Sequence, residues 1–294
     1  MTPPTSPPPG LVRRILASPP ARMLLLGVVL LVMMGLNGDV MTSDAAEPIK
    51  AVAHIIALAI AGFAVYIGHA HFVERRTVTE LGLTGMGRQF GIGLLVGAGL
   101  YAACEGMLMA LGIYRIDGLN PLSFLIPAVA MAISSSVFEE LLFRGVLYRS
   151  VETWFGSWAA LVVSSLVFGL SHLANPQATL EGALFIAVEA GVLLGAAVML
   201  TRRLWLGIGF HMAWNYTQSA IFSGVVSGNE AEPGWIRSTV RGPDYLTGGP
   251  FGVESSVLAL VLCTTTGIVM LVMAHRRGLV VPPVWKRPVT SARE

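Results

Sequence analysis

The sequence predicts an all-α, polytopic membrane protein, a bundle of about eight transmembrane helices with a conical or cavity-containing core. Of its 294 residues, 54% are apolar and 12% are charged, about half the roughly 25% of charged residues that is usual in soluble domains. The mean hydropathy is +0.70. Eight apolar runs, most of them about 18–25 residues long, suffice as helices to cross roughly 30 Å of hydrocarbon. They lie near residues 23–40, 51–72, 90–113, 122–147, 157–175, 182–200, 204–222 and 253–274.

These runs should be helices because a helix satisfies its own backbone hydrogen bonds in lipid, where no water is available. The same composition excludes a soluble globule and a disordered chain. A formal net charge of only +2 offers no strongly basic surface. The expected partner is therefore the lipid bilayer, and no nucleic acid is expected.

The positions of lysine and arginine predict the orientation. They concentrate in alternate connections, which places those connections on one side, the cytoplasmic side by the positive-inside rule. An even number of spans then puts both termini in the cytoplasm. The chain divides into a disordered, proline-rich tail at 1–20, a membrane domain at 21–276 and a basic cytoplasmic tail at 277–294. The basic residues are Arg13, Arg14 and Arg22 before the first run, Arg75, Arg76 and Arg88 after the second, Arg144 and Arg149 after the fourth, Arg202 and Arg203 after the sixth, and Arg276, Arg277, Lys286, Arg287 and Arg293 after the last.

The composition of two stretches does not predict transmembrane helices. Residues 74–88 mix charged residues with leucines, which predicts a short interfacial helix. Residues 223–252 are rich in glycine, proline and charge, and they predict the longest external loop. A solvated connector is the simpler interpretation of this loop, and a lid over a site is the alternative.

The fourth run contains two adjacent carboxylates and an arginine. Inserting an ionisable group at the membrane centre costs roughly 2.5–3.5 kcal/mol, so such groups in a span indicate a structural or functional role. Glu140 and Arg144 are four residues apart and can pair on one helix face. Glu139 lies about 100° around the helix and is left free to act as a base. The alternative is a salt bridge that only joins helices.

The fifth run ends in Phe-Gly-Leu-Ser-His, with Phe168 one turn before His172. The fourth and fifth runs are joined near Gly156. Glu139 lies 17 residues before this turn and His172 lies 16 residues after it. In an antiparallel helix hairpin these two positions meet at similar height, so the carboxylate and the imidazole are placed to share a water.

The seventh run contains His211 and Asn215, which share a helix face because they are four residues apart. Both side chains can donate hydrogen bonds to an oxygen, as an oxyanion hole requires. Hydrogen bonds between helices are the alternative role, since histidine and asparagine often serve it in membrane bundles.

The three motifs together resemble the CPBP family of intramembrane proteases. They are Glu-Glu-x-x-x-Arg at 139–144, Phe-x-x-x-His at 168–172 and His-x-x-x-Asn at 211–215. The family includes the eukaryotic CAAX prenyl endopeptidases of the Rce1 type and the bacterial Abi proteins. The motif-bearing core covers about residues 120–222, roughly a third of the chain, and the family's all-helical core agrees with the eight-span prediction.

The resemblance implies proteolysis within the membrane. By similarity, Glu139 is the base that activates water together with His172, His211 and Asn215 form the oxyanion hole, and Glu140 and Arg144 support the site. Both metal-dependent and metal-free mechanisms have been put forward for the family. No His-Glu-x-x-His zinc motif is present, which favours a site without a cofactor. A Zn²⁺ ion held by Glu139, His172 and His211 is the alternative, because three protein ligands suffice in catalytic sites.

The sequence thus predicts an intramembrane endopeptidase that hydrolyses a peptide bond of a membrane-associated protein or peptide. The expected location is the bacterial cytoplasmic (inner) membrane. Two other functions stay open at this point. One is a non-enzymatic immunity or scaffold protein of the same fold. The other is a proton-coupled transporter that would use acids such as Glu105 and Glu189.

Overall fold

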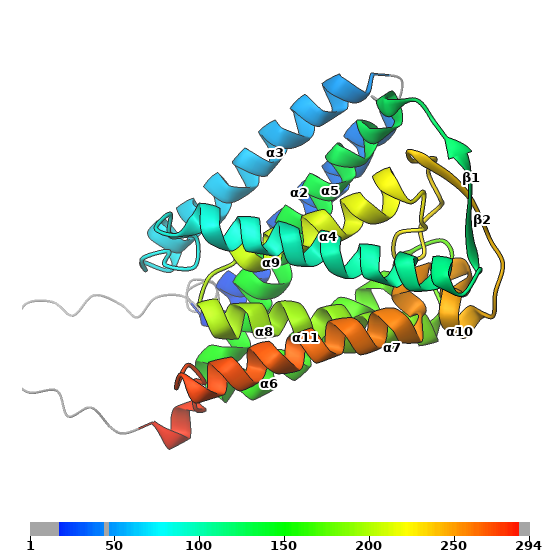
Figure 1. The fold of residues 1–294 in the computed structure, drawn as a ribbon. Helices are drawn as coiled ribbons and strands as arrows, with labels where there is room; N and C mark the ends of the chain where they lie inside the picture. The colour runs from blue at the N-terminus through cyan, green and yellow to red at the C-terminus, as the bar shows by residue number, and fades with distance from the viewer. Residues whose placement is uncertain (1–17, 44–46, 288–294) are drawn as a thin grey trace, which may run out of the picture.

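The computed structural model describes residues 18–43 and 47–287, and it shows a polytopic bundle of helices (Figure 1). The predicted all-α fold class is therefore confirmed. The predicted disordered tail at 1–20 and the last residues of the basic tail at 277–294 lie mostly outside the described residues. Within the described part, α2 begins and the last short helix ends at the same end of the bundle, and the one pair of strands lies at the opposite end (Figure 1).

Ten α-helices form the described part of the bundle, and shorter π- and 3₁₀-helical segments extend or join them. The α-helices are α2 (Pro19–Ser43), α3 (Pro48–Gly68), α4 (Met86–Ala110), α5 (Pro127–Glu139), α6 (Arg149–Ser171), α7 (Leu180–Ile186), α8 (Val192–Thr201), α9 (Trp205–Tyr216), α10 (Asp244–Thr247) and α11 (Val257–Arg276). The π-helical segments are η1 (His69–Val73), η3 (Glu140–Tyr148), η5 (Ala187–Gly191) and η6 (Thr217–Ile221). The 3₁₀ segments are η2 (Leu122–Leu125), η4 (His172–Ala174), η7 (Gly249–Phe251), η8 (Val253–Ser255) and η9 (Val284–Lys286).

Six helical stretches among the described residues are long and apolar enough to cross a membrane. One of them, Leu122–Ala174, has 53 residues and turns back at Gly156, where φ is 81°, so it contains two of the predicted spans. The predicted seventh span is shorter than expected, since α9 has 12 residues and η6 adds five. The fold class is thus confirmed, and the number of eight passes stays a prediction.

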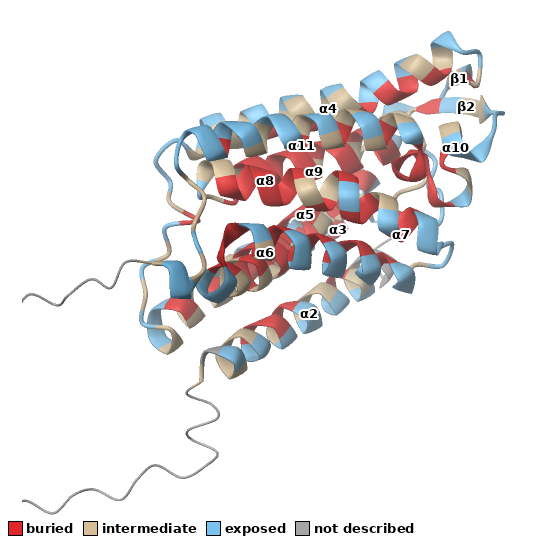
Figure 2. Cartoon of the chain, turned by 90° about the horizontal axis from the view of Figure 1, so that it is seen from below, coloured by how far each residue is buried: buried red, intermediate tan, exposed pale blue. Residues whose placement is uncertain are grey.

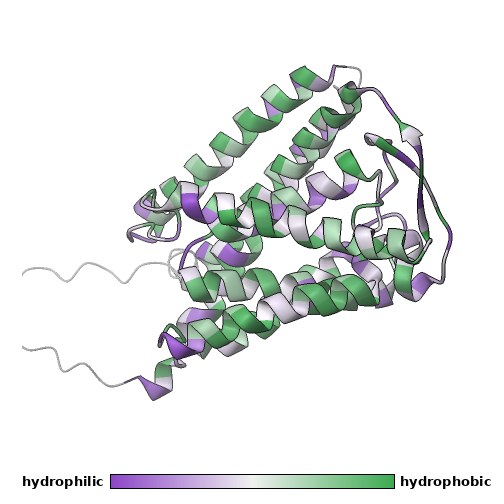
Figure 3. Cartoon of the chain, in the orientation of Figure 1, coloured by the Kyte–Doolittle hydropathy of each residue, from purple (hydrophilic) through white to green (hydrophobic). Residues whose placement is uncertain are grey.

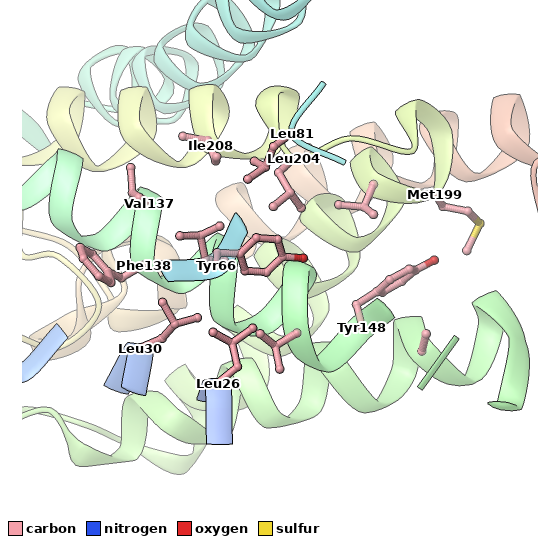
Figure 4. Packing of buried hydrophobic residues seen from close by; sticks show 14 of the residues in the cluster. Leu26, Leu30, Tyr66, Leu81, Val137, Phe138, Tyr148, Met199, Leu204 and Ile208 are labelled. Carbon is pink, nitrogen blue, oxygen red and sulfur yellow. The ribbon is translucent and has the colours of Figure 1, made fainter. Parts of the chain in front are cut away.

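The outer surface of the bundle is apolar, as a lipid-facing surface should be (Figure 3). Large hydrophobic side chains are well exposed on α2, α3 and α4, including Leu24 at 61%, Ile60 at 64% and Leu95 at 77%. Buried residues line the inner faces, and α8 is buried along most of its length (Figure 2). One apolar core cluster joins α2, α3, α5, η3, α8 and α9 through residues such as Leu30, Phe138 and Ile208 (Figure 4).

Helix α9 reaches the centre of the bundle because glycines let its backbone approach α4. A Cβ added at Gly93 would overlap the Leu206 carbonyl, and one added at Gly97 would overlap the Phe210 carbonyl. In the other direction, a Cβ on Gly209 would overlap the backbone of α4. Small residues allow such close helix packing in membranes, where lipid is as apolar as the helices themselves.

Replacing Gly97 with alanine is expected to lower the melting temperature of the purified protein and its accumulation in membranes. The added methyl meets backbone atoms of α9, which cannot move aside as a flexible side chain would, and overpacking typically costs about 1–3 kcal/mol. Gly99→Ala is the matched control, because no atom lies within 4 Å of a Cβ built there. Equal melting temperatures for the two variants would contradict the close approach of α4 and α9.

The loop at 223–252 is not the solvated connector that was expected. It contains β2 (Ile236–Val240), which pairs antiparallel with β1 (Tyr114–Leu119) from the connection between α4 and α5. Its residues Ile236 and Phe251 are buried. Gly228 N donates to the carbonyl of Phe251, so the two ends of the loop are tied together. This packed segment covers one end of the bundle (Figure 1).

The opposite end of the bundle is held by an ion-pair cluster. The predicted interfacial helix at 74–88 is wrong, because residues 74–85 are irregular and α4 begins only at Met86. Instead, the charges of this segment bind neighbouring arginines. Glu74 accepts from Arg149 Nη2 at 2.8 and 2.9 Å, and Glu80 pairs with Arg76 at 2.7 Å. Tyr66 donates to Glu80 at 2.6 Å.

The cluster predicts a loss of stability in acid. Burial opposes ionisation of Glu74 and Glu80, but hydrogen bonds from Arg76 and the nearby positive charges hold the pKa of both carboxyls below the usual 4.5. A lowered pKa contributes stability that is present above pH 4.5 and is lost as the pH falls through the folded-state pKa. The melting temperature should therefore stay level from neutral pH to about 5 and fall below it. A Glu74→Gln/Glu80→Gln double variant should fall less steeply, and parallel curves for the two proteins would refute this assignment.

Candidate active site

The first two acids of the site lie where the helix changes its winding. Glu139 is the last residue of α5 and Glu140 is the first residue of the π-helical segment η3. A π-helical segment inserts extra backbone into a helix and often marks a functional site. It leaves Glu140 fully buried, while the side chain of Glu139 stays 12% exposed. The two adjacent carboxylates thus occupy different surroundings.

Glu140 and Arg144 form the ion pair that their spacing indicates. Arg144 Nη1 donates to Glu140 Oε1 at 3.0 Å, and both side chains are 0% exposed. The guanidinium of Arg144 lies 4.2 Å from the centre of the Phe168 ring, a distance suited to a cation–π contact. The pair therefore joins α5 and η3 to α6 in the interior of the bundle.

His211 stands between the two carboxylates. Its Nδ1 lies 3.3 Å from Glu140 Oε1, and its Nε2 lies 3.8 Å from Glu139 Oε2. One turn further along α9, Asn215 Nδ2 donates to the hydroxyl of Ser135 at 2.9 Å. Ser135 itself is one turn before Glu139 on α5. The first and third motifs are thus held side by side at two points.

His172 reaches the same region from the end of α6. Its Nδ1 lies 2.8 Å from the carbonyl of Phe168, which leaves Nε2 as the other ring nitrogen for a ligand. The Phe168 ring lies edge-on to His172 at 4.9 Å and to His211 at 6.1 Å. The second motif therefore contacts the other two through Phe168. The imidazole that the structure places beside Glu139 is that of His211, and the predicted sharing of a water by Glu139 and His172 stays a prediction.

A small cavity lies among these residues. Its volume is about 20 Å³, and a cavity of roughly 10–15 Å³ by this measure can hold one water. His172, His211 and Asn215 line it together with two further acids, Glu189 and Glu254. Glu139 does not line the cavity itself but lies 3.8 Å from His211, which does. Its Oε2 is buried without a hydrogen-bond partner among the described residues. An unbonded carboxylate oxygen is free to accept a proton or a hydrogen bond.

His172 and His211 reach the same cavity from different parts of the bundle. The turn at Gly156 lies against the chain that follows α11, because Ser157 N donates to the carbonyl of Val281 at 2.9 Å, five residues after α11 ends at Arg276. His172 lies at the other end of α6 from this turn. Because α9 begins only at Trp205, His211 lies six residues into it.

Sequence reasoning missed two acids of the cavity as site residues. The sequence indicates Glu189 only as one acid of a transporter relay. It does not indicate Glu254, because an acid at the start of the last apolar run has the pattern of an interfacial residue. The structure buries Glu254 at 5% exposure, and it accepts hydrogen bonds from Trp214 and Ser227.

The alternative zinc set is not assembled. Among the residues that the structure describes, no group of three or more histidine, cysteine, aspartate or glutamate side chains is placed to hold a metal ion. Glu139, His172 and His211 therefore do not form a ligand cluster in this conformation. The two cysteines, Cys104 and Cys263, are buried as free thiols.

Comparison with known proteins identifies the region that carries the motifs. Residues 121–217 match the family described as type II CAAX prenyl endopeptidase Rce1-like. This region coincides closely with the predicted motif-bearing core at 120–222 and includes all six predicted site residues. Searches of curated proteins and of solved structures found no match. The resemblance drawn from the motifs is confirmed for this region, which is similar to a family of the protease type.

Proposed function

We propose that this protein is an intramembrane endopeptidase that hydrolyses a peptide bond of a membrane-associated protein or peptide. The observation that carries the proposal is the convergence of the three motifs. Glu139, His211 and Asn215 are held together by contacts between α5 and α9, and His172 lines the same water-sized cavity as the latter two. The match to the Rce1-like family supports a proteolytic role for this arrangement.

Each side chain has a task in peptide hydrolysis. Glu139 offers an unbonded carboxylate oxygen that takes a proton from water, with His172 as the second group that orients the water. The water oxygen attacks the peptide carbonyl and a tetrahedral oxyanion forms. His211 donates to it through Nε2 in its doubly protonated form, whose Nδ1 donates to Glu140. The second N–H of the Asn215 amide, whose first N–H is bonded to Ser135, also donates to it. Glu139 then delivers the proton to the leaving amine, which completes the cleavage.

Glu140 and Arg144 act through other residues. Glu140 accepts a hydrogen bond from His211 Nδ1, which directs the opposite nitrogen toward Glu139 and the site. Arg144 balances the charge of Glu140 and packs on Phe168, the ring that lies between the two histidines. The proposed location is the bacterial inner membrane with both termini in the cytoplasm, because the arginine-rich connections lie at the end of the bundle where α2 begins.

The proposal is tested by comparing membrane proteomes of cells that carry the wild-type protein or Glu139→Gln at equal abundance. At least one membrane-associated protein should be present as fragments in the first and intact in the second. Identical proteomes, together with a binding partner that both proteins capture equally, would instead indicate the non-enzymatic scaffold.

A further inference from the structure

Glu254 lies outside the three motifs and outside the family-matched region, yet it lines the cavity of the candidate site. It belongs to η8, the short helix that leads from the 223–252 loop into α11. Its side chain is buried, and both carboxylate oxygens accept hydrogen bonds. Oε1 accepts from Trp214 Nε1 at 3.1 Å, while Oε2 accepts from Gln218 Nε2 at 3.3 Å and from both the backbone N (2.5 Å) and the hydroxyl (2.9 Å) of Ser227.

Two of the donors come from α9 and its continuation η6, the helix that carries the third motif, and the others come from the 223–252 loop. Trp214 lies on α9 directly before Asn215, and Gln218 lies on η6, the π-helical continuation of α9. Ser227 lies in the loop that covers this end of the bundle. Its carbonyl accepts from Asn175 Nδ2 at 2.6 Å, and Asn175 comes three residues after His172. Glu254 is therefore the acceptor that links α9 to the chain after His172.

A carboxylate suits this place for a physical reason. Four donors converge on two oxygens in a buried setting, and an anion satisfies such donors better than a neutral acceptor does. Removing the acceptor would leave buried N–H and O–H groups unpaired, which is costlier than the net gain of each bond. The second buried acid of the cavity, Glu189, has an oxygen without a partner among the described residues, so it does not hold segments together in this way.

We propose that Glu254 is a positioning residue of the peptidase site, which fixes the His211–Asn215 face of α9 relative to His172 by binding Trp214, Gln218 and Ser227. This inference rests on the proposed function and extends it. It assigns a part in the geometry of catalysis to the loop at 223–252 and to η8, the short helix that follows it. Glu254 does not touch substrate in this scheme. It keeps the two sides of the cavity at the separation that one water requires.

Glu254→Gln tests the proposal because it changes the hydrogen bonding and little else. If the glutamine carbonyl replaces Oε2, its NH₂ group faces the Trp214 N–H, and two donors then oppose each other. The turnover number should fall about 10–100-fold, the factor expected for losing one bond to a charged group, while KM stays within about twofold. The probe is a quenched fluorescent peptide from a protein that accumulates uncut in Glu139→Gln membranes.

Adding Trp214→Phe should then restore part of the activity. The phenylalanine removes the opposing N–H. The turnover number of the double variant should therefore be about three- to tenfold higher than that of Glu254→Gln alone. A merely structural role would give additive losses. Glu105→Gln is the matched control, since Glu105 is also a buried acid, accepts a bond from Tyr101 and does not line the cavity. Wild-type turnover in Glu254→Gln, or additive losses in the double variant, would overturn the proposal.

Amide hydrogen exchange separates this inference from the proposed function. Exchange of residues 172–178 and 224–229 should be faster in Glu254→Gln than in the wild type and unchanged in Glu105→Gln, whether or not any peptide is cleaved. If the wild type cleaves no probe, the proposed function fails and exchange alone decides the positioning role. If Glu254→Gln does not accumulate, Ser227→Ala removes the hydroxyl donor alone and should raise exchange in the same two segments. Unchanged exchange there would refute the link.

Discussion

Glu139→Gln is expected to lose roughly 10²–10⁴-fold of the turnover number, the usual contribution of a general acid–base group, while accumulating in membranes like the wild type. Glutamine has nearly the same shape as glutamate but cannot take a proton from water. The side chain that it replaces is 12% exposed and forms no hydrogen bond through Oε2 with a described residue. Because glutamine keeps the same shape beside His211, the substitution should remove chemistry with little effect on packing. The measurement is cleavage of the fluorescent peptide by protein purified in detergent, with the melting temperature recorded in parallel.

His172→Ala should show a similar loss of turnover, because His172 lines the cavity and is the group proposed to orient the water there. The control for both variants is Glu105→Gln, which alters a buried acid outside the cavity and should retain turnover. Wild-type cleavage by Glu139→Gln, in a preparation free of other proteases, would refute Glu139 as the base.

Arg144→Met is expected to destabilise the protein by about 3–5 kcal/mol, the range found when one partner of a buried ion pair is removed. The side chains of Arg144 and Glu140 are both 0% exposed, so the buried carboxylate of Glu140 would lose the guanidinium and keep only its contact with His211. Methionine keeps much of the packing against Phe168 but loses the charge. The expected readouts are a large drop in melting temperature and low accumulation in the membrane.

The double variant Glu140→Gln/Arg144→Met separates stability from catalysis. With both charges gone, the fold should regain most of its stability, because a buried ion pair contributes little beyond what apolar packing provides. Turnover should remain low, since His211 loses the carboxylate bonded to its Nδ1. A double variant as unstable as Arg144→Met would show that the arginine acts through its packing on Phe168 and not through its charge.

Much of the site could be predicted from local spacing. The pairing of Glu140 with Arg144 and the common helix face of His211 and Asn215 depend only on the turn of a single helix, where residues four apart are neighbours. The meeting of the fourth and fifth spans was counted from Gly156, and the structure indeed turns there. That Glu139 and His172 share a water stays a prediction. Counting within the hairpin could not show that His211, from a separate helix, lies beside Glu139.

The positions of two non-helical segments could not be predicted in this way. Residues 74–85 have a mixed composition that suits an interfacial helix, but ion pairs of Glu74 and Glu80 with distant Arg149 and nearby Arg76 determine their path. Glycine and proline at 223–252 suggested a solvated connector, whereas pairing with β1 and burial of Phe251 make it part of the structure. Contacts between segments far apart in the chain leave no periodic pattern in the sequence.

By itself, the sequence determined that this chain is a helical membrane protein with a buried polar site, because apolar runs and the cost of charge in lipid depend on composition alone. It also determined which side chains share a helix face. Only the tertiary structure decided which of those faces meet. The approach of α4 to α9 through Gly93 and Gly97, the contact of the Gly156 turn with the chain after α11 and the burial of Glu254 all follow from packing between distant segments. Such packing depends on shape complementarity over the whole interior. Every local sequence pattern contributes to this complementarity, but no single pattern specifies it.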